Sequence, residues 1–370
     1  MMLLNRLFVG SIATSNMFMN ISALIAIIVL ASIKSGSALS QSICSAGSAK
    51  LRKLCLNNYN ESGDVKAKAN ALPGVHDALS AKIYAEAGAK VLFVSGFGIT
   101  ATRLGLPDAG ILTLSEMEDA TQSISNAFSD QPLLERPALI VDGDTGYGGP
   151  ANIRRTVRSL ARSGAAAITI EDQIFPNRKC TYAVGEQIRI LNRNDSLERI
   201  EVALKARDEA KELDGNDVMI VARTDCRAAL GLEEALERCE MYEELGADMV
   251  YAENLQSPLE YEELRKRLSV PTILAQLQTT PEQNNLLSLD DIGVLGYDFA
   301  LFGVSGLQAI ISALQSNAQH VLQTGYYDNK LNHEHCEKSS LASFQEVKRV
   351  VGFDDLEAFE KLCTESTSRK

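Results

Sequence analysis

From Ala69 onward the chain alternates short apolar runs with longer stretches whose apolar residues recur at the spacing of an amphipathic helix. Helical patterns such as residues 153–163 and 232–245 lie between most of these runs. Apolar strands that alternate with helices indicate a parallel sheet covered on both faces. Eight such units in about 250 residues predict an α/β fold of the (β/α)8 TIM-barrel type rather than an open sheet. The expected strands are residues 71–72, 91–94, 138–141, 167–170, 218–221, 249–251, 272–274 and 299–302.

In such a barrel the chemistry lies at the carboxyl ends of the strands. Asp142 and Asp144 are two positions apart, so both side chains can point to the same side just past a strand end. Taken alone, this Asp-Gly-Asp run is also explained by a solvated turn. Carboxylates and an arginine at one rim favour a divalent cation site, because Mg²⁺ takes one or two carboxylates and leaves its other positions to water and substrate. The rim residues are Ser95, Gly96, Phe97, Asp142, Asp144, Glu171, Arg223, Glu253, Gln276 and Ser305.

The composition supports a large folded region and excludes one class of partner. Of the 370 residues, 45% are hydrophobic, which is enough for a substantial core. The formal net charge is −12, from 36 basic and 48 acidic residues. Because no basic run is interleaved with aromatic residues, nucleic acid is not an expected partner.

The first sixty residues carry basic side chains but no acidic ones. Their apolar run at 21–33 is shorter than the roughly 20 residues that a membrane-spanning helix needs, and small residues follow it. This layout predicts a signal peptide cleaved near Ala38, followed by a serine-rich stretch at 40–60 that resembles a transit peptide. We expect residues 1–60 to be a presequence that directs the chain to an organelle or the secretory route, with a plastid favoured over a mitochondrion. A signal anchor that is not removed is the alternative.

Five motifs in order resemble the isocitrate lyase and phosphoenolpyruvate mutase superfamily, in particular its short members. Those members include methylisocitrate lyase, oxaloacetate hydrolase, dimethylmalate lyase and the phosphonomutases. The resemblance covers about residues 69–325. The motifs are Val94-Ser95-Gly96-Phe97-Gly98, Gly105-Leu106-Pro107-Asp108, Val141-Asp142-Gly143-Asp144-Thr145-Gly146-Tyr147-Gly148, Ile170-Glu171-Asp172-Gln173 and Ala222-Arg223-Thr224-Asp225.

The resemblance implies a (β/α)8 barrel at 61–325, in which the last helix is exchanged between the subunits of a homodimer or homotetramer. A C-terminal helical extension at 326–370 would pack on the neighbouring subunit. The resemblance also implies Mg²⁺, with Mn²⁺ as an alternative ion, held largely through water by Asp142, Asp144, Glu171 and Asp108. Ser95, Gly96, Phe97 and Arg223 would hold the carboxylate of a small carboxylic-acid substrate, and Glu253, Gln276 and Ser305 would also contact that substrate.

In lyase members, the loop after the fourth strand reads Lys-Arg-Cys-Gly-His or Lys-Lys-Cys-Gly-His, and its cysteine transfers a proton. Here the corresponding run is Arg178-Lys179-Cys180, followed by Thr181 and Tyr182 in place of the glycine and histidine. We expect all three residues of the run to be catalytic. The two cations are expected to lower the pKa of Cys180 and raise its thiolate fraction. An ordinary loop cysteine is the alternative interpretation.

The favoured function is a Mg²⁺-dependent carbon–carbon lyase or hydrolase acting on a small 2-oxo or 2-hydroxy dicarboxylate through an enolate. The first alternative is a mutase-like enzyme acting on a P–C bond, a phosphonomutase or a phosphonopyruvate hydrolase. The mutase branch has a Lys-Thr-Asn-Ser loop instead of the cysteine. The second alternative is a weakly active barrel that binds a metabolite. The seventh strand ends at Gln276 and lacks the Asn-x-x-Glu pattern of lyases, so the substrate cannot be transferred from the family.

Overall fold

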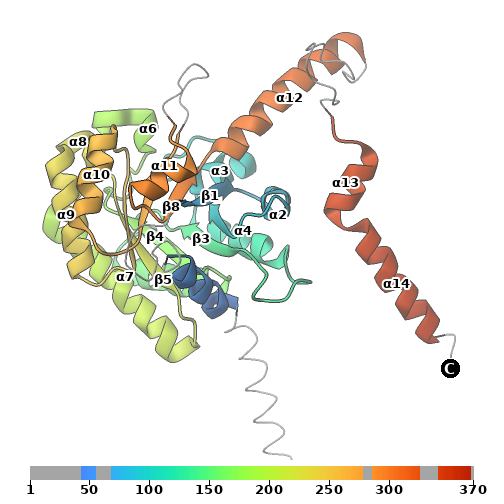
Figure 1. The fold of residues 1–370 in the computed structure, drawn as a ribbon, viewed down its shortest axis with the longest axis horizontal. Coiled ribbons are helices and arrows are strands. Elements are labelled where there is room, and N and C mark those ends of the chain that lie inside the picture. Colours follow the sequence, from blue (N-terminus) through green and yellow to red (C-terminus); the bar gives the residue numbers. More distant parts are fainter. Residues whose placement is uncertain (1–42, 56–67, 278–285, 326–340, 368–370) are drawn as a thin grey trace, which may run out of the picture.

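A computed structural model describes residues 43–55, 68–277, 286–325 and 341–367 (Figure 1). The strands form one closed barrel in chain order, and every neighbouring pair is parallel. Pairing of Asn70 with Phe299 joins the first strand to the last. The predicted (β/α)8 barrel is therefore confirmed. The strands are β1 (Asn70–Val75), β2 (Val91–Val94), β3 (Ala138–Asp142), β4 (Ala167–Glu171), β5 (Met219–Thr224), β6 (Met249–Ala252), β7 (Thr272–Ala275) and β8 (Phe299–Phe302).

Helices surround the barrel, and local sequence signals start several of them (Figure 1). Asp77 and Thr113 form capping boxes at the starts of α2 and α4. Pro150 and Pro258 stand at the first position of α5 and α10, where their fixed φ suits a helix. The helices of the barrel wall are α2 (Ala78–Glu86), α4 (Leu114–Asn126), α5 (Pro150–Arg162), α7 (Arg193–Asp214), α9 (Leu232–Glu244), α10 (Pro258–Arg267), α11 (Leu289–Val294) and α12 (Ser305–Thr324).

Shorter elements occupy the loops at the carboxyl ends of the strands. They matter because the rim residues lie on or beside them. These elements are α3 (Gly96–Ile99), the π-helix η1 (Thr100–Leu104), α6 (Thr181–Val184), the 3₁₀ helix η2 (Gly185–Gln187) and α8 (Arg227–Leu230).

A helix at residues 43–55 closes the amino end of the barrel. Leu51 and Leu54 belong to the same apolar cluster as the inward-facing side chains of the strands. Ser48 lies fully buried and donates to the carbonyl of Cys44 at 3.0 Å, while Lys50 Nζ donates to the carbonyl of Arg136 at 2.5 Å. The folded domain therefore begins at residue 43 or earlier, so the expected boundary at residue 61 lies too far along the chain. The predicted apolar segment and the cleavage near Ala38 lie outside the described residues.

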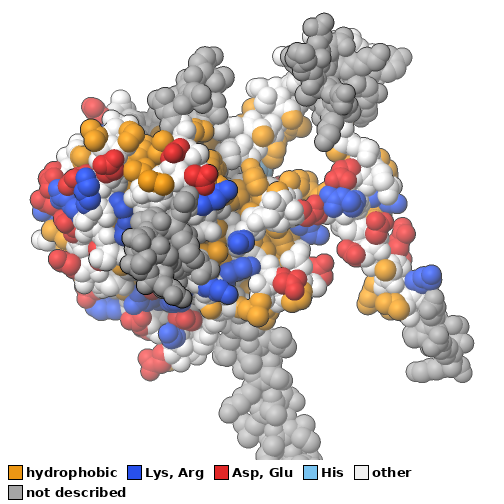
Figure 2. All heavy atoms as spheres, viewed as in Figure 1, with side chains coloured by type: hydrophobic (Ala, Val, Ile, Leu, Met, Phe, Trp, Pro, Cys, Tyr) orange, Lys and Arg blue, Asp and Glu red, His pale blue; other side chains and the backbone are white. Residues whose placement is uncertain are grey.

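The chain ends in an arm of three helices, α12, α13 (Phe344–Val351) and α14 (Phe353–Thr367). In Figure 1, α12 starts at the barrel and projects outward, and Arg349 of α13 pairs with Glu86 of α2 at 2.8 Å. Leu307 is the buried residue of α12, and α13 has none. Figure 2 shows hydrophobic side chains on the outside of this arm, and those more than a third exposed are Ile310, Ile311, Leu314, Leu322, Phe344, Val347, Val351, Phe353, Leu356, Phe359 and Leu362. The expected exchange of the last helix between subunits stays a prediction. No helix in the described ranges is long and apolar enough to cross a membrane.

Candidate active site

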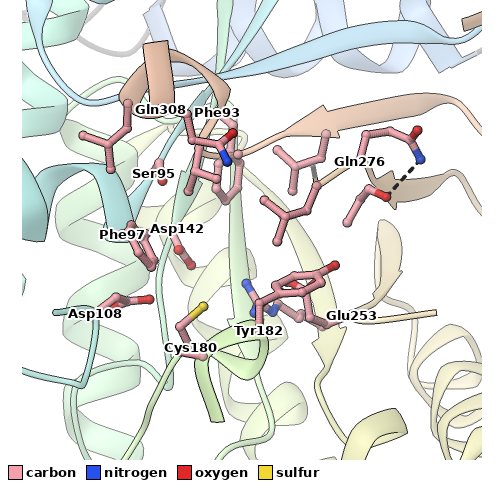
Figure 3. Close-up of a pocket in the computed structure, with 18 of the residues that line it drawn as sticks. Phe93, Ser95, Phe97, Asp108, Asp142, Cys180, Tyr182, Glu253, Gln276 and Gln308 are labelled. Carbon is pink, nitrogen blue, oxygen red and sulfur yellow. Dashed lines mark hydrogen bonds and ion pairs between the residues drawn. The ribbon is translucent and has the colours of Figure 1, made fainter. Parts of the chain in front are cut away.

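A cavity of about 460 Å³ opens at the carboxyl ends of the strands (Figure 3). Its size and position are typical of a small-molecule site in this fold. The lining brings together residues from distant parts of the chain: Phe93, Ser95, Phe97, Asp108, Asp142, Arg178, Cys180, Tyr182, Ala183, Arg223, Tyr251, Glu253, Ala275, Gln276, Leu277, Leu301, Gly303, Val304, Leu307, Gln308 and Ile311.

Arg178 lies at the centre of the predicted metal ligands. Its Nε donates to Glu171 Oε1 at 2.9 Å, and its Nη2 lies 3.2 Å from Asp144 Oδ1. Its Nη1 also pairs with Asp108. The Arg178 side chain is only 3% exposed, so this loop residue contributes a buried positive charge. The charge lies among a group of buried carboxylates, which we call the acidic floor. Arg178 lines the cavity and pairs with the carboxylates, and its expected catalytic role stays a prediction.

Asp142 and Asp144 do converge, as their spacing predicted. Thr169 Oγ1 donates to Asp142 Oδ1 at 3.0 Å and fixes that side chain. Gly96 comes so close that a Cβ there would lie 3.1 Å from Asp142 Oδ2 and 3.4 Å from Asp144 Oδ1. Glycine therefore lets the loop after β2 pack against both carboxylates.

The floor holds more negative than positive charge. Six buried carboxylates meet two buried guanidinium groups, those of Arg178 and Arg223; the acids are Asp108, Asp142, Asp144, Glu171, Asp225 and Glu253. Burial raises the pKa of Asp144 to about 7 and also raises the pKa of Glu171, against the opposing effect of Arg178. Asp144 Oδ1 and Glu171 Oε2 are buried and make no hydrogen bond, and each has only an arginine nitrogen at ion-pair distance, Arg178 Nη2 at 3.2 Å and Arg223 Nε at 3.4 Å. Orphaned acceptors and raised carboxylate pKa values are the properties expected where a further cation belongs.

These residues fit Mg²⁺ held mainly through water. In the described part of the chain, no three His, Cys, Asp or Glu side chains come together closely enough to hold an ion directly. Mg²⁺ commonly accepts one or two carboxylates and keeps several waters. The orphaned oxygens of Asp144 and Glu171 are suitable acceptors for such waters.

Arg223 and Glu253 form a buried ion pair and also line the cavity. Arg223 Nη2 lies 2.9 Å from Glu253 Oε2, and Arg223 Nε donates to Asp225 Oδ1 at 2.6 Å. Tyr251 donates from its hydroxyl to Glu253 Oε2 at 2.6 Å, and Tyr182 also hydrogen-bonds to Glu253. The pair is therefore both a buried ion pair of the barrel and a part of the cavity lining, so a structural role does not exclude contact with a substrate.

Cys180 points its sulfur into the cavity beside Asp108 and Tyr182 (Figure 3). Its backbone N–H donates to the carbonyl of Asp108 at 3.0 Å. Burial, together with the carboxylates of Asp108 and Glu253, raises the pKa of the thiol to about 11. The expected lowering of this pKa is wrong, because Arg178 turns to the acidic floor and Lys179 does not approach the thiol. The thiol is protonated at neutral pH.

Lys179 is exposed and borders a separate small cavity with Asn177, Gln187, Ile188 and Arg189. Ser305 is also absent from the lining of the main cavity; its hydroxyl donates to the carbonyl of Phe302 at 3.2 Å. Lys179 and Ser305 thus lie outside the cavity lining. Gly96, Asp144 and Glu171 are also outside it, but they contact the lining residues Asp142 and Arg178. Gln276 does line it, but its amide nitrogen donates to Ala275 O at 3.0 Å and its oxygen accepts from Leu287 N at 2.8 Å. The Gln276 side chain is thus already engaged.

Two features of the site were missed from the sequence. Thr181 Oγ1 donates to Asp225 Oδ2 at 2.6 Å and ties the Cys180 loop to the end of β5. Gln173 supports this tie, because it donates to the same oxygen at 2.8 Å and accepts from Lys179 N at 3.0 Å. The replacement of the family's glycine by Thr181 was the available signal. The second feature is an apolar wall built from the ends of β7 and β8 and the start of α12.

Comparison with known proteins places the chain among lyases and mutases. "Petal death protein" of Dianthus caryophyllus is 40% identical over 285 residues, 76% of this chain and 81% of that protein. A 2-methylisocitrate lyase of Aeropyrum pernix is 33% identical over 287 residues, 77% and 83% of the two chains. The chloroplastic carboxyvinyl-carboxyphosphonate phosphorylmutase of Arabidopsis thaliana is 32% identical over 288 residues, 76% and 77% of the two chains.

Solved structures agree with the sequence comparison. Oxaloacetate acetylhydrolase in complex with 3,3-difluorooxalacetate superposes with a TM-score of 0.73 at 28% identity, covering 86% of this chain and 97% of that one. Phosphonopyruvate hydrolase in complex with oxalate and Mg²⁺ superposes with a TM-score of 0.67 at 25% identity, covering 85% and 98%. The family model described as phosphoenolpyruvate phosphomutase matches residues 64–322. The resemblance seen in the motifs is thereby confirmed: this chain belongs to the phosphoenolpyruvate phosphomutase family, within the isocitrate lyase and phosphoenolpyruvate mutase superfamily.

Proposed function

We propose that this chain is a Mg²⁺-dependent carbon–carbon lyase or hydrolase that acts on a small 2-oxo or 2-hydroxy dicarboxylate through an enolate. One observation carries the proposal. The Cys180 thiol lines one cavity with the carboxylates of Asp108 and Asp142, and Arg178 in the same lining pairs with Asp144 and Glu171, each of which has an oxygen without a hydrogen bond. Cleavage that leaves an enolate needs a proton donor and a positive charge near the forming oxyanion, and this cavity offers a place for both.

Asp142, Asp144, Glu171 and Asp108 would hold the ion, largely through water. When bound, Mg²⁺ would stabilise the negative charge that develops on the 2-oxygen of the substrate. Mn²⁺ is the alternative ion. The bound Mg²⁺ in the phosphonopyruvate hydrolase structure supports this assignment by similarity.

Protein side chains would bind the substrate and transfer the protons. Arg223 binds the carboxylate next to the 2-oxygen, since a planar guanidinium suits that contact. Glu253, held by Arg223 and Tyr251, accepts the proton of a 2-hydroxyl group. On a 2-oxo substrate this hydroxyl belongs to the hydrate that forms when water adds to the 2-carbonyl carbon. The carbon–carbon bond then breaks, its electron pair forms the enolate, and the Cys180 thiol donates its proton to the enolate carbon.

Substrate turnover tests the proposal. The full chain is incubated with oxaloacetate, methylisocitrate-type acids and phosphonopyruvate, each with Mg²⁺ and with EDTA. We expect metal-dependent cleavage of a dicarboxylate and at least about a hundredfold loss of kcat in Cys180→Ala, the usual size of a proton-transfer contribution.

The mutase family name supports one alternative, an enzyme acting on a P–C bond. Turnover of phosphonopyruvate that survives Cys180→Ala would establish that alternative and refute the lyase. Metal-dependent binding of oxalate without turnover of any acid would instead leave a barrel that only binds a metabolite.

We also propose that a second copy of this chain covers the apolar side of α12 to α14, in a homodimer or homotetramer. The exposed aromatic and aliphatic residues of that arm support an occupied surface, as patches of this kind are rare on monomers. Light scattering after gel filtration should give a mass of at least two chains. Phe359→Asp combined with Leu362→Asp should shift that mass towards one chain.

We propose delivery of the chain to an organelle, with the plastid as the favoured destination. The presequence-like composition before residue 43 and the chloroplastic name of the Arabidopsis relative support this. Residues 1–42 fused to a fluorescent protein should direct it to plastids in leaf cells. Accumulation at the endoplasmic reticulum or along the secretory route would favour the signal peptide or anchor.

A further inference from the structure

A second cavity, which we call the loop cavity, is formed by the loop after β4. Its volume is about 240 Å³, and its lining consists of Asn177, Lys179, Gln187, Ile188 and Arg189. The lining of the main cavity contains none of these five residues. Two of the five are cationic, two carry amides and none is acidic, so the loop cavity offers hydrogen-bond donors to an anion.

Both cations of the loop cavity are available to a ligand. The residues Lys179 and Arg189 are exposed, and neither side chain forms an ion pair or a hydrogen bond with any residue that the structure describes. Arg178 and Arg193, which lie close to them in the sequence, each pair with at least two carboxylates. In a chain with 48 acidic and 36 basic residues, two unpaired cations that share one cavity indicate a place for an anion from solution.

The loop cavity also joins the two sides of the loop that carries Cys180. Gln173 pairs with Ile190 in an antiparallel bridge, so the loop closes at its base. Lys179 belongs to the outgoing side of the loop and Arg189 to the returning side. One anion that contacts both cations would therefore link the two sides, next to the residue that carries the thiol.

A phosphate group suits these donors. The planar guanidinium of Arg189 can donate two parallel N–H bonds to two phosphate oxygens, and the Lys179 ammonium supplies a compact point charge. The two amides can donate to the remaining oxygens. The volume equals the space of about eight water molecules at roughly 30 Å³ each, of which the non-hydrogen atoms of phosphate take about five. About three further atoms of a small phosphate ester therefore fit.

We propose that the loop cavity binds a phosphate group, either inorganic phosphate or the phosphate of a small monoester, and that the bound group holds the Cys180 loop in its present conformation. The backbone N–H of Lys179 already donates to Gln173 Oε1 at 3.0 Å, and Gln173 Nε2 donates to Asp225 Oδ2 at 2.8 Å. A phosphate on the Lys179 side chain would add a second attachment to the segment that these bonds hold. The inference does not depend on the proposed function, since it requires neither Mg²⁺ nor turnover.

Calorimetry on the full chain tests the site with inorganic phosphate, glycerol 3-phosphate and acetate, at equal low ionic strength and in EDTA. Without a metal ion, the acidic floor repels phosphate from the main cavity. We expect saturable binding of phosphate and of the ester, and at least about tenfold weaker binding of the monoanion acetate. A tighter fit of the ester would identify a phosphorylated metabolite as the ligand, and equal affinities would identify phosphate itself.

Three variants locate the binding site. Arg189→Met and Lys179→Met should each weaken phosphate binding at least about tenfold, which corresponds to the loss of one hydrogen bond to a charged group. Arg155→Met is the matched control, because Arg155 is an exposed arginine of α5 that makes no ion pair with a described residue, and it should leave the affinity unchanged.

Alkylation of Cys180 by iodoacetamide tests the effect on the loop. The half-buried thiol reacts faster when the loop opens, so saturating phosphate should slow the reaction at least about threefold in the wild type and not in Arg189→Met.

The failure of this inference differs from that of the proposed function, because neither readout needs turnover. No saturable binding of phosphate, or equal binding by Arg189→Met, overturns the site. Binding that leaves the alkylation rate unchanged overturns its link to the loop. An enzyme that cleaves no dicarboxylate refutes the proposed function alone.

Discussion

At the scale of single residues, neighbours in the sequence need not be neighbours in space. The side chains of Arg178, Lys179 and Cys180 point in three directions, so the two cations do not lie beside the thiol. Only contacts from distant segments show that Arg178 neutralises the floor while Asp108 and Glu253 face the thiol. The pKa of Cys180 is therefore raised, not lowered, and the neutral thiol persists to high pH.

This raised pKa predicts that the Cys180 thiol reacts slowly with alkylating agents. With a pKa of about 11, roughly one Cys180 side chain in a thousand is a thiolate at pH 8, against about a quarter for an ordinary thiol. We expect alkylation of Cys180 by iodoacetamide, followed by mass spectrometry, to be about a hundredfold slower at pH 8 than in the denatured chain. The rate should keep rising beyond pH 10. A rate that levels off by pH 8 would contradict the raised pKa.

Arg178→Met tests the buried charge balance. Removing one partner of a buried ion pair costs about 3 to 5 kcal/mol, because the carboxylates are left without compensation. We therefore expect a clearly lower melting temperature in EDTA, and a larger recovery with added Mg²⁺ than the wild type shows. Arg193→Met, which removes exposed pairs with Glu234 and Glu237, serves as the control and should change little. Equal effects of the two variants would argue against the central place of Arg178.

At the scale of elements, the loop after β4 is held by side-chain hydrogen bonds that end on Asp225. Thr181→Val keeps the shape but removes one of these bonds, at a cost of about 1 to 3 kcal/mol for a buried acceptor. Asp225 keeps Gln173 and Arg223, so folding should survive. We expect faster tryptic cleavage after Lys179 and a lower kcat with a smaller change in KM.

Thr272→Val provides the matched control for the loop variant. The Thr272 hydroxyl is fully buried in β7 and has no hydrogen-bond partner, so its loss should be neutral or stabilising. If both valine variants slow the enzyme equally, the loop anchor is not the cause.

At the scale of the whole molecule, the barrel could be predicted because its apolar strands and intervening helices are local patterns. The acidic rim could be predicted from the barrel, because the carboxyl ends of all its strands lie at one edge. Asp142, Glu171 and Arg223 were identified in this way. The apolar wall was not, because the sequence does not show which side of the helix carrying Leu307 and Ile311 faces the cavity. The 43–55 helix was missed because the same basic, acid-free composition also suits a targeting peptide.

The 43–55 helix limits where a presequence could be cleaved without destabilising the barrel. Leu51 and Leu54 fill the amino end of the barrel beside Leu72 and Ala166, so a chain that begins at residue 43 should keep the stability of the full chain, and one that begins at 56 should lose it. Burial of the two leucines alone is worth about 3 to 6 kcal/mol. The milder Leu51→Ala should cost about 2 to 5 kcal/mol by urea unfolding. Lys53→Ala, on the exposed side of the helix, should cost little. A chain beginning at 56 with unchanged stability would restore the presequence boundary near residue 60, whereas the expected loss requires cleavage upstream of residue 43.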